Sequence, residues 1–291
     1  MVFSPGSQVG RYRVDGPIGR GKPDGLFGVV DSEGRAFAMR SPIADLEDHG
    51  TAITDRFAPD AAALRSVMHR NLVPLFDTFV DKGYLCLVTE RVRGRALSAA
   101  IHEGGLHPRA SLIIVRQVLD AAAAAHAAGC VHRALQPSCV LLVQMHGWEL
   151  AKVADFGLAM LRDEAVLEFG NDALTGTVRK TPAAYMAPEQ VRGRSADPRT
   201  DLYAIGTIIF EALTGRVPYL DFDPENVMSL QVSGRLPTLD EICPGAPWIT
   251  DPIRALITRA LAKDREERFQ NAQQMITAVD EAFASLQHLQ E

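Results

Sequence analysis

The pattern of hydrophobic residues changes near residue 94, and this change most constrains the fold. Before it, from about Gln8 to Leu87, short apolar runs typical of β-strands surround one helix-like stretch. The expected strands are 12–18, 26–30, 36–39, 72–79 and 84–88, and the expected helix is 61–68. A polar cluster ending in glycine, Asp31 to Gly34, predicts a hairpin turn between two of these strands. The first part of the chain is therefore predicted to be a small sheet with a helix laid on it.

After Gly94 the sequence predicts mainly helices. Residues 109–128 are rich in Ala, Leu, Ile and Val, which favour a helix and supply a face to bury. Residues 201–213, 253–262 and 271–286 predict further helices, with Pro- and Gly-containing loops at 215–218 and 244–247. The chain is therefore expected to adopt an α+β fold with a sheet-based part followed by a mainly helical part.

The overall charge and the cysteines argue against several classes of function. A formal net charge of -6 gives no electrostatic reason to expect nucleic-acid binding. The four cysteines show no CxxC or Cys/His grouping of a zinc site, so reduced thiols are expected. The N-terminus has no signal-peptide pattern, and no uninterrupted apolar run is long enough to span a bilayer. We therefore expect a cytoplasmic chain without membrane contact in this segment, and any membrane anchor would lie outside it.

Residues 130–142, CVHRALQPSCVLL, directly follow the long alanine-rich stretch. They resemble the catalytic loop of protein kinases, whose usual form in bacterial Ser/Thr kinases is close to IVHRDLKPSNILL. In this comparison Ala134 stands at the catalytic aspartate, Gln136 at the loop lysine and Cys139 at the metal-binding asparagine. The family aspartate gives general-base assistance, typically worth about 10²- to 10⁴-fold, which alanine cannot supply. The resemblance thus implies a loop with no competent catalytic residue, in which Cys139 is a small packing residue.

Other motifs of the same family occur in the expected order over nearly the whole chain. Residues 18–26, IGRGKPDGL, resemble the Gly-rich loop that covers ATP phosphates, although a plain hairpin turn would also fit. Gly19 and Gly21 match the family, whereas Asp24 stands at the third small position and Leu26 at the usual valine. A carboxylate beside a polyphosphate is repulsive, so Asp24 counts against tight ATP binding unless it points away.

The phosphate-anchoring lysine of the family is replaced by Arg40 in FAMR, and its glutamate partner by Asp60. Arginine is longer, planar and forked, so the exchange is not neutral. Because Asp60 follows Pro59, we expect the helix to begin near Pro59 and to hold Asp60 in its first turn. An Arg40–Asp60 ion pair and an ordinary surface pairing both remain open.

Residues 85–92, LCLVTERV, resemble the last N-lobe strand and the hinge, although a plain core strand fits the first half equally well. In the family, Thr89 would be the gatekeeper, and Glu90 to Val92 would offer backbone groups to an adenine. The DFG motif at 155–157 is intact, and its aspartate is the family's magnesium ligand. The positions that the resemblance assigns to nucleotide contact are Ile18, Gly19, Gly21, Leu26, Ala38, Arg40, Asp60, Thr89, Glu90, Val92, Leu141 and Asp155.

The resemblance assigns structural roles to a second set of residues. Phe156 and His132 would stack with Leu64, Asp201 would hold the backbone of the catalytic loop, and Glu189 would pair with Arg268. The segment 158–186 corresponds to the activation loop, where phosphorylated Thr175, Thr177 or Thr181 would pair with Arg133, unless these are ordinary loop threonines. The structural set is His132, Arg133, Phe156, Gly157, Glu189, Asp201 and Arg268.

The resemblance implies a two-lobed protein kinase fold, with an antiparallel N-lobe sheet and one main helix at 1–90, a hinge at 91–94 and a mainly helical C-lobe at 95–291. We expect a pseudokinase that acts as a scaffold or allosteric partner of an active kinase or another signalling protein. It would require no cofactor, and ATP with one magnesium remains open as a structural ligand. The alternative is a slow Ser/Thr kinase, or another ATP-dependent transferase, that uses Arg40 and Asp155.

Overall fold

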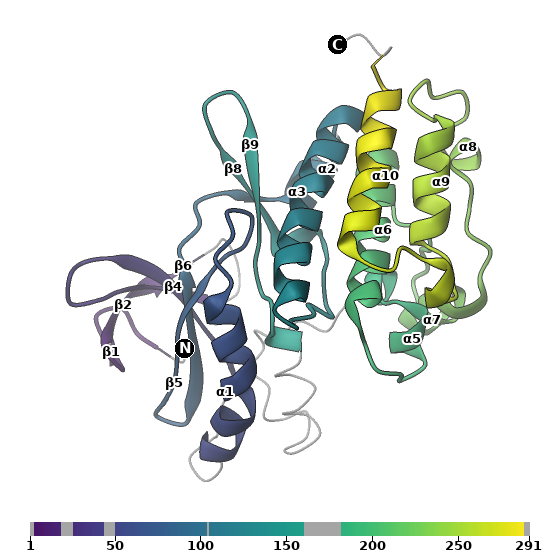
Figure 1. The fold of residues 1–291 in the computed structure, drawn as a ribbon. Helices are drawn as coiled ribbons and strands as arrows, with labels where there is room; N and C mark the ends of the chain where they lie inside the picture. Colours follow the sequence, from purple (N-terminus) through teal and green to yellow (C-terminus); the bar gives the residue numbers. More distant parts are fainter. Residues whose placement is uncertain (1–2, 19–25, 44–49, 104, 160–181, 288–291) are drawn as a thin grey trace. The chain divides into compact units, whose positions relative to one another are not determined.

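The computed structural model describes residues 3–18, 26–43, 50–103, 105–159 and 182–287 (Figure 1). Within these ranges, the side chains of residues 42, 43, 50–56 and 60 lie outside the description. The chain forms two compact units. Unit 1 joins Met1–Arg93 with Ala128–His132 and Asp155–Arg179, and unit 2 comprises Gly94–Ala127, Arg133–Ala154 and Lys180–Glu291.

Unit 1 is built on an antiparallel sheet with the strand order β1-β2-β3-β4-β6-β5. Its strands are β1 (Gln8–Val9), β2 (Tyr12–Pro17), β3 (Leu26–Val30), β4 (Ala36–Ile43), β5 (Leu75–Asp81) and β6 (Tyr84–Glu90), and its helix is α1 (Gly50–Ser66). The predicted hairpin after β3 is confirmed, because the Asp31 carboxylate accepts hydrogen bonds from the backbone N–H groups of Glu33 and Arg35. Gly34 completes this turn with a φ of 78°, a conformation that favours glycine.

One face of the sheet forms the apolar core of unit 1. Alternate strand residues point to the same face, so Phe27 and Val29 of β3 lie beside Met39 of β4 and Val88 of β6. The chain preceding the sheet also joins this core. The ring of Phe3 packs edge-on against Phe27 and Tyr84, with ring centroids 5.5 Å apart in each pair. The core cluster comprises Phe3, Val9, Tyr12, Val14, Phe27, Val29, Met39, Cys86 and Val88.

The predicted start of the first helix is wrong. Helix α1 begins at Gly50 and continues through Pro59, so Asp60 does not lie in its first turn. A proline inside a helix removes one backbone hydrogen bond and crowds the preceding turn. Burial offsets this cost, since Phe57, Ala61 and Leu64 are 0–8% exposed and their spacing places them on one face of the helix.

Unit 2 consists of a small antiparallel sheet and a set of packed helices. Its strands are β7 (Arg95–Ala96), β8 (Val140–Gln144) and β9 (Glu149–Val153), in the order β7-β8-β9. Its helices are α2 (Leu97–His102), α3 (Pro108–Ala127), α5 (Pro188–Val191), α6 (Pro198–Thr214), α7 (Pro224–Ser233), α8 (Leu239–Ile242), α9 (Asp251–Ala260) and α10 (Ala272–Ser285), with short 3-10 turns η1 (Pro137–Cys139), η3 (Ala183–Tyr185) and η4 (Arg265–Glu267). Figure 1 shows α3 beside α10, with α6 packed next to them.

Helix α3 is long and apolar enough to cross a membrane by length and composition alone, and it is the one such helix found in the described part of the chain. Many of its apolar side chains are buried in unit 2, among them Leu112, Val115, Val118 and Leu119. The same composition therefore suits a core helix packed between other helices.

The structure contains elements for which the sequence pattern gave no prediction. Helix α7 was missed because its buried face holds one apolar residue, Val227, and one polar residue, Gln231. The β8–β9 hairpin was missed because the first three residues of β8 belong to the motif at 130–142, which was assigned as a loop. The four long predicted helices are present with shifts of one to three residues at their ends.

Candidate functional site

The strand register of unit 1 gathers several of the predicted nucleotide-contact residues. Arg40 pairs with Leu26 across β3 and β4, and Ala38 pairs with Thr89 across β4 and β6. Directly opposed residues share a face of an antiparallel sheet, and Ala38 and Arg40 are two residues apart on one strand. Leu26, Ala38, Arg40 and Thr89 therefore lie on the face opposite the apolar core of unit 1. Ile18 lies beside Leu26, because its N–H donates to the carbonyl of Leu26 at 2.9 Å.

The same unit places Asp155, the aspartate of the DFG motif, beside Arg40, which replaces the family's lysine. Nη2 of Arg40 lies 3.4 Å from Oδ1 of Asp155, and both side chains are partly buried. Opposite charges at this distance attract strongly where water is partly excluded. Asp155 also has a φ of 69°, which is uncommon for a residue other than glycine. The carboxylate that would hold magnesium in the family is thus paired with a guanidinium.

The residues next to Asp155 form a packed apolar contact within unit 1. The rings of His132 and Phe156 meet edge-on with centroids 4.7 Å apart. Gly157 has a φ of 82°, and a Cβ there would lie 2.6 Å from the Leu64 side chain. His132 thus contacts Phe156 as the resemblance implies, and Leu64 lies against Gly157, the next residue in the chain.

In unit 2, the backbone of the degenerate loop is held by Asp201 of α6. Oδ1 of this buried carboxylate accepts a 2.9 Å hydrogen bond from the Arg133 N–H, and its Oδ2 lies 2.7 Å from Nε2 of His126. Gln190, which the sequence analysis did not single out, donates from its side chain to the Arg133 carbonyl at 2.7 Å. Arg133 has a φ of 63°, so these contacts hold it in a conformation that is unfavourable for a side-chain-bearing residue.

Two of the three substituted positions of the loop, Gln136 and Cys139, are buried, and Ala134 is partly exposed. Gln136 directly precedes the 3-10 turn η1 and Cys139 is its last residue, and the Cys139 N–H donates to the Gln136 carbonyl at 2.9 Å. The Cys139 thiol donates to the Ala134 carbonyl at 3.7 Å and is 6% exposed. The loop therefore has an ordered backbone, with a methyl group, a buried amide and a buried thiol at the positions of the family's reactive side chains.

The packing of Cys139 makes a testable prediction about thiol reactivity. All four cysteines are free, with Cys86, Cys130 and Cys139 buried and Cys243 partly exposed. Burial also raises the pKa of Cys86 to about 12, which keeps that thiol protonated and unreactive. We expect N-ethylmaleimide to modify one thiol, Cys243, in the folded chain and the other three only after unfolding, as read by peptide mass spectrometry. A Cys243→Ser variant is the control, and rapid labelling of Cys139 would contradict the packed loop.

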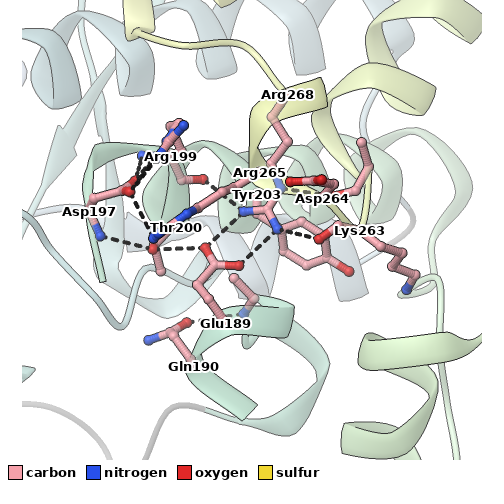
Figure 2. A network of polar contacts seen from close by, with 12 residues as sticks. Glu189, Gln190, Asp197, Arg199, Thr200, Tyr203, Lys263, Asp264, Arg265 and Arg268 are labelled. Carbon is pink, nitrogen blue, oxygen red and sulfur yellow. Dashed lines mark hydrogen bonds and ion pairs between the residues drawn. The ribbon is translucent and has the colours of Figure 1, made fainter. Parts of the chain in front are cut away.

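A buried ion pair lies at the centre of the polar network in unit 2 (Figure 2). Nη1 and Nη2 of Arg268 each lie 2.8 Å from an oxygen of Glu189, and both residues are buried. The Thr200 hydroxyl adds a 2.9 Å hydrogen bond to Glu189. Burial raises the pKa of Glu189, but the hydrogen bonds and charge of Arg268 outweigh it and hold that pKa below its ordinary value. This is the pairing that the resemblance implies for Glu189 and Arg268.

Helix α7 is fixed to the segment preceding α5 by side chains that the sequence analysis did not identify. The Gln231 amide donates to the carbonyls of Ala183 and Ala184 at 3.1 and 2.7 Å. Nζ of Lys263 donates to the carbonyls of Leu230 and Gln231 and to the Tyr219 hydroxyl. Burial, with the nearby charges of Arg268 and Arg192, lowers the pKa of Lys263 to about 8. Helix α7 is thus a firmly attached element of unit 2.

Several predicted positions lie outside the described part of the chain. These are Gly19, Gly21, Asp24, the Asp60 side chain, and Thr175, Thr177 and Thr181. Glu90 and Val92 are described at and after the end of β6, and Leu141 lies on β8 of unit 2. In the described part, no group of three or more His, Cys, Asp or Glu side chains has the arrangement of a metal site.

The chain belongs to the protein kinase family. The family model for the protein kinase domain matches residues 12–279, and the fold is the two-lobed protein kinase fold with an antiparallel β-sheet N-lobe and a helical C-lobe. The Mycobacterium tuberculosis PknI kinase domain has a similar structure, with a TM-score of 0.73, 20% sequence identity, and coverage of 96% of this chain and 99% of that one.

Curated relatives with similar sequences are named bacterial serine/threonine-protein kinases. Pkn1 of Myxococcus xanthus is 33% identical over 283 residues, covering 96% of this chain and 39% of the relative. PrkC of Bacillus subtilis is 32% identical over 283 residues, covering 94% of this chain and 41% of the relative. The chain therefore spans about two fifths of the length of these relatives.

Proposed function

We propose that this protein kinase domain is a pseudokinase that binds a protein partner and does not transfer phosphate efficiently. The observation that carries the proposal is Ala134, which occupies the position of the family's catalytic aspartate on a loop whose backbone is held by Asp201 and Gln190. A disordered loop could lose activity even if its catalytic residues were present. Here the backbone of the loop is ordered, and the catalytic aspartate itself is replaced by alanine.

The pairing of Arg40 with Asp155 supports the same proposal. A magnesium ion prefers several oxygen ligands in a near-octahedral arrangement, and a carboxylate is its usual protein ligand. At Asp155 this carboxylate is already neutralised by the guanidinium of Arg40 at 3.4 Å. An ion would have to displace that contact before it bound.

The second metal position is also poorly suited to magnesium. Cys139 stands where the family has an asparagine, and its buried thiol donates to the Ala134 carbonyl. A thiol is a soft ligand, whereas magnesium is a hard ion that selects oxygen. The residues present therefore do not fit the family's two-magnesium arrangement, and we derive no reaction step through it.

The second candidate function is a slow Ser/Thr protein kinase, or another ATP-dependent transferase, that uses Arg40 and Asp155. The intact contact between His132 and Phe156 and the names of the curated relatives favour it. Phosphoryl transfer depends strongly on positioning and charge stabilisation, so loss of a base does not by itself abolish it. The simultaneous changes at Ala134, Cys139 and Arg40 favour the pseudokinase.

The proposal also covers the cellular location and the binding partner of the domain. We propose a cytoplasmic location and a protein partner, either an active kinase or another signalling protein. The net charge of -6 gives no electrostatic basis for a nucleic-acid partner. Membrane contact is not part of the proposed role of this segment.

Thermal unfolding with nucleotide tests the proposal. A ligand at 100 times its dissociation constant stabilises a protein by about 2.7 kcal/mol, which gives a clear shift in melting temperature. We expect ATP with magnesium to give no larger shift than ATP with EDTA, because Arg40 already neutralises Asp155. An Asp155→Asn variant is the control and should show the same lack of magnesium dependence. A shift that requires magnesium and is lost in Asp155→Asn would favour the kinase alternative.

A further inference from the structure

The loop that precedes α7 carries two highly exposed apolar side chains. Leu220 is 77% exposed and Phe222 is 109% exposed, which means that Phe222 makes almost no contact with the rest of the described chain. Large apolar side chains are usually buried at least in part, and an exposed apolar cluster rimmed by polar groups marks an interaction site. Two such residues lie here within three positions of the chain.

The backbone of this loop is held in place by its own aspartates. Oδ1 of Asp221 accepts hydrogen bonds from the Asp223 N–H at 2.9 Å and from the Asn226 side chain at 3.3 Å. Asp223 then caps α7 by accepting from the Glu225 N–H at 2.9 Å. Phe222 is therefore presented from a fixed backbone at the start of a helix that Gln231 and Lys263 fasten to unit 2. A preorganised anchor loses less conformational entropy when it binds.

The charged residues of the loop itself, within 220–226, are all acidic. Asp221, Asp223 and Glu225 are all exposed and lie within five positions of Leu220. Hydrogen bonds from the Asp223 N–H and the Asn226 side chain lower the pKa of Asp221, so it is ionised at neutral pH. The nearest cationic residue in the sequence is Arg216, four positions before Leu220, and Lys263 is engaged by the Tyr219 hydroxyl and by the carbonyls of Leu230 and Gln231. The surface thus combines an apolar anchor with three negative charges.

We propose that residues 220–225 form a docking surface for a basic segment of a partner protein, one that places arginine or lysine beside an aliphatic side chain. The apolar side chain would pack on Phe222 and Leu220, and the cationic groups would pair with Asp221, Asp223 and Glu225. Electrostatic complementarity of this kind selects partners and speeds their association. The surface lies apart in the sequence from the residues of the candidate site, and the proposal holds whether or not the domain transfers phosphate.

Two other occupants fit this surface less well. A biological membrane surface is anionic, and three carboxylates would be repelled by it. A second copy bound through the same patch in a two-fold dimer would bring like charges together. A basic protein segment is the occupant that satisfies both the apolar and the charged groups.

The test measures binding of two fluorescein-labelled peptides to the whole chain by fluorescence anisotropy. The basic probe is GRRLIRRG and the acidic probe is GEELIEEG, which share the same apolar centre. We expect the basic probe to bind at least about tenfold more tightly than the acidic one, and Phe222→Ser to weaken that binding by about tenfold or more. Glu225→Gln should weaken it less and reduce its salt dependence.

The matched control is Met68→Ser, which removes another large apolar side chain that is 73% exposed but lies in unit 1. It should leave peptide binding unchanged. The proposal is overturned if the two probes bind equally, if the basic probe does not bind, or if Phe222→Ser and Met68→Ser behave alike. It is also overturned if the wild-type chain floats with anionic vesicles, or sediments as a dimer, and Phe222→Ser abolishes that behaviour.

Discussion

Replacing Arg268 with alanine is expected to destabilise unit 2 by about 3–5 kcal/mol, since it leaves a buried carboxylate without its partner. Both guanidinium contacts to Glu189 are 2.8 Å long, and Arg268 also donates to the carbonyls of Ala262 and Lys263. All of these bonds are lost together in the variant. Both tryptophans of the chain, Trp148 and Trp248, lie in unit 2, so urea unfolding followed by tryptophan fluorescence reports on this unit.

The control for Arg268→Ala is Arg254→Ala, which removes an arginine from exposed pairings with Asp240 and Asp251. Exposed ion pairs contribute little to stability, so this variant should unfold close to wild type. A small loss of stability in Arg268→Ala, equal to that in Arg254→Ala, would contradict a structural role for the buried pair.

The effect of Arg268→Ala is expected to depend on pH. Because the pKa of Glu189 is lowered in the folded state, the pair stabilises the protein above the unfolded pKa of glutamate, near 4.3, and this stability is lost as pH falls through the folded pKa. The difference in unfolding free energy between wild type and variant should therefore be largest at neutral pH and shrink in acid. A difference that stays constant from neutral pH into acid would show that Glu189 is not the titrating partner.

Replacing Asp201 with alanine is expected to free the backbone of the degenerate loop. Each hydrogen bond to a charged group contributes about 1.5–3 kcal/mol, and Asp201 holds both the Arg133 N–H and His126. We expect a loss of about 3 kcal/mol in unfolding free energy, and faster amide hydrogen exchange in residues 133–139, measured by mass spectrometry. The reason is that Arg133, at a φ of 63°, has no other described acceptor for its N–H.

The control for Asp201→Ala is Asp280→Ala, which removes an exposed carboxylate that pairs with Arg116. Exchange in residues 133–139 should be unchanged in this variant. If Asp201→Ala also leaves the exchange unchanged, the backbone of the loop does not depend on Asp201 of α6 for its shape.

The elements of the fold that were predicted correctly are those with local causes. The hairpin after β3 follows from Asp31, whose carboxylate binds two backbone N–H groups of its own turn. Helix α6 has comparable signals at both ends, an Asp197 cap followed by proline and a Gly215 with a φ of 76°. In these cases the residues that specify the structure lie within a few positions of it.

The elements that were predicted wrongly or not at all depend on contacts between distant segments of the chain. Pro59 is a strong local signal to begin a helix, but the buried stripe of Phe57, Ala61 and Leu64 carries α1 through it. In α7 the buried face holds the polar residue Gln231, so the apolar pattern of a helix is not visible in the sequence. Gln231 can be buried because it bonds to Ala183, Ala184 and Tyr203 from other segments. Packing between segments decided both outcomes, and a single sequence does not display it.

The candidate site was predictable in its residue identities but not in its contacts. The order of the family motifs in the sequence was enough to assign Ala134, Cys139 and Asp155 to the family's catalytic and metal-binding positions. The proximity of Arg40 to Asp155 was not predicted, because it arises only when β4 and the DFG segment come together in unit 1. Gln190 was also missed, although it directly follows a residue that the motifs identified.

The central claim is that the domain keeps the kinase fold and lacks efficient phosphoryl transfer. The most direct measurement is incorporation of radiolabelled phosphate from ATP with magnesium, into the chain itself and into a generic protein substrate, for wild type, Asp155→Asn and Ala134→Asp. We predict no incorporation by wild type above the Asp155→Asn background, and none by Ala134→Asp, because Cys139 and Arg40 remain. Incorporation by wild type that disappears in Asp155→Asn, or robust activity in Ala134→Asp, would contradict the account.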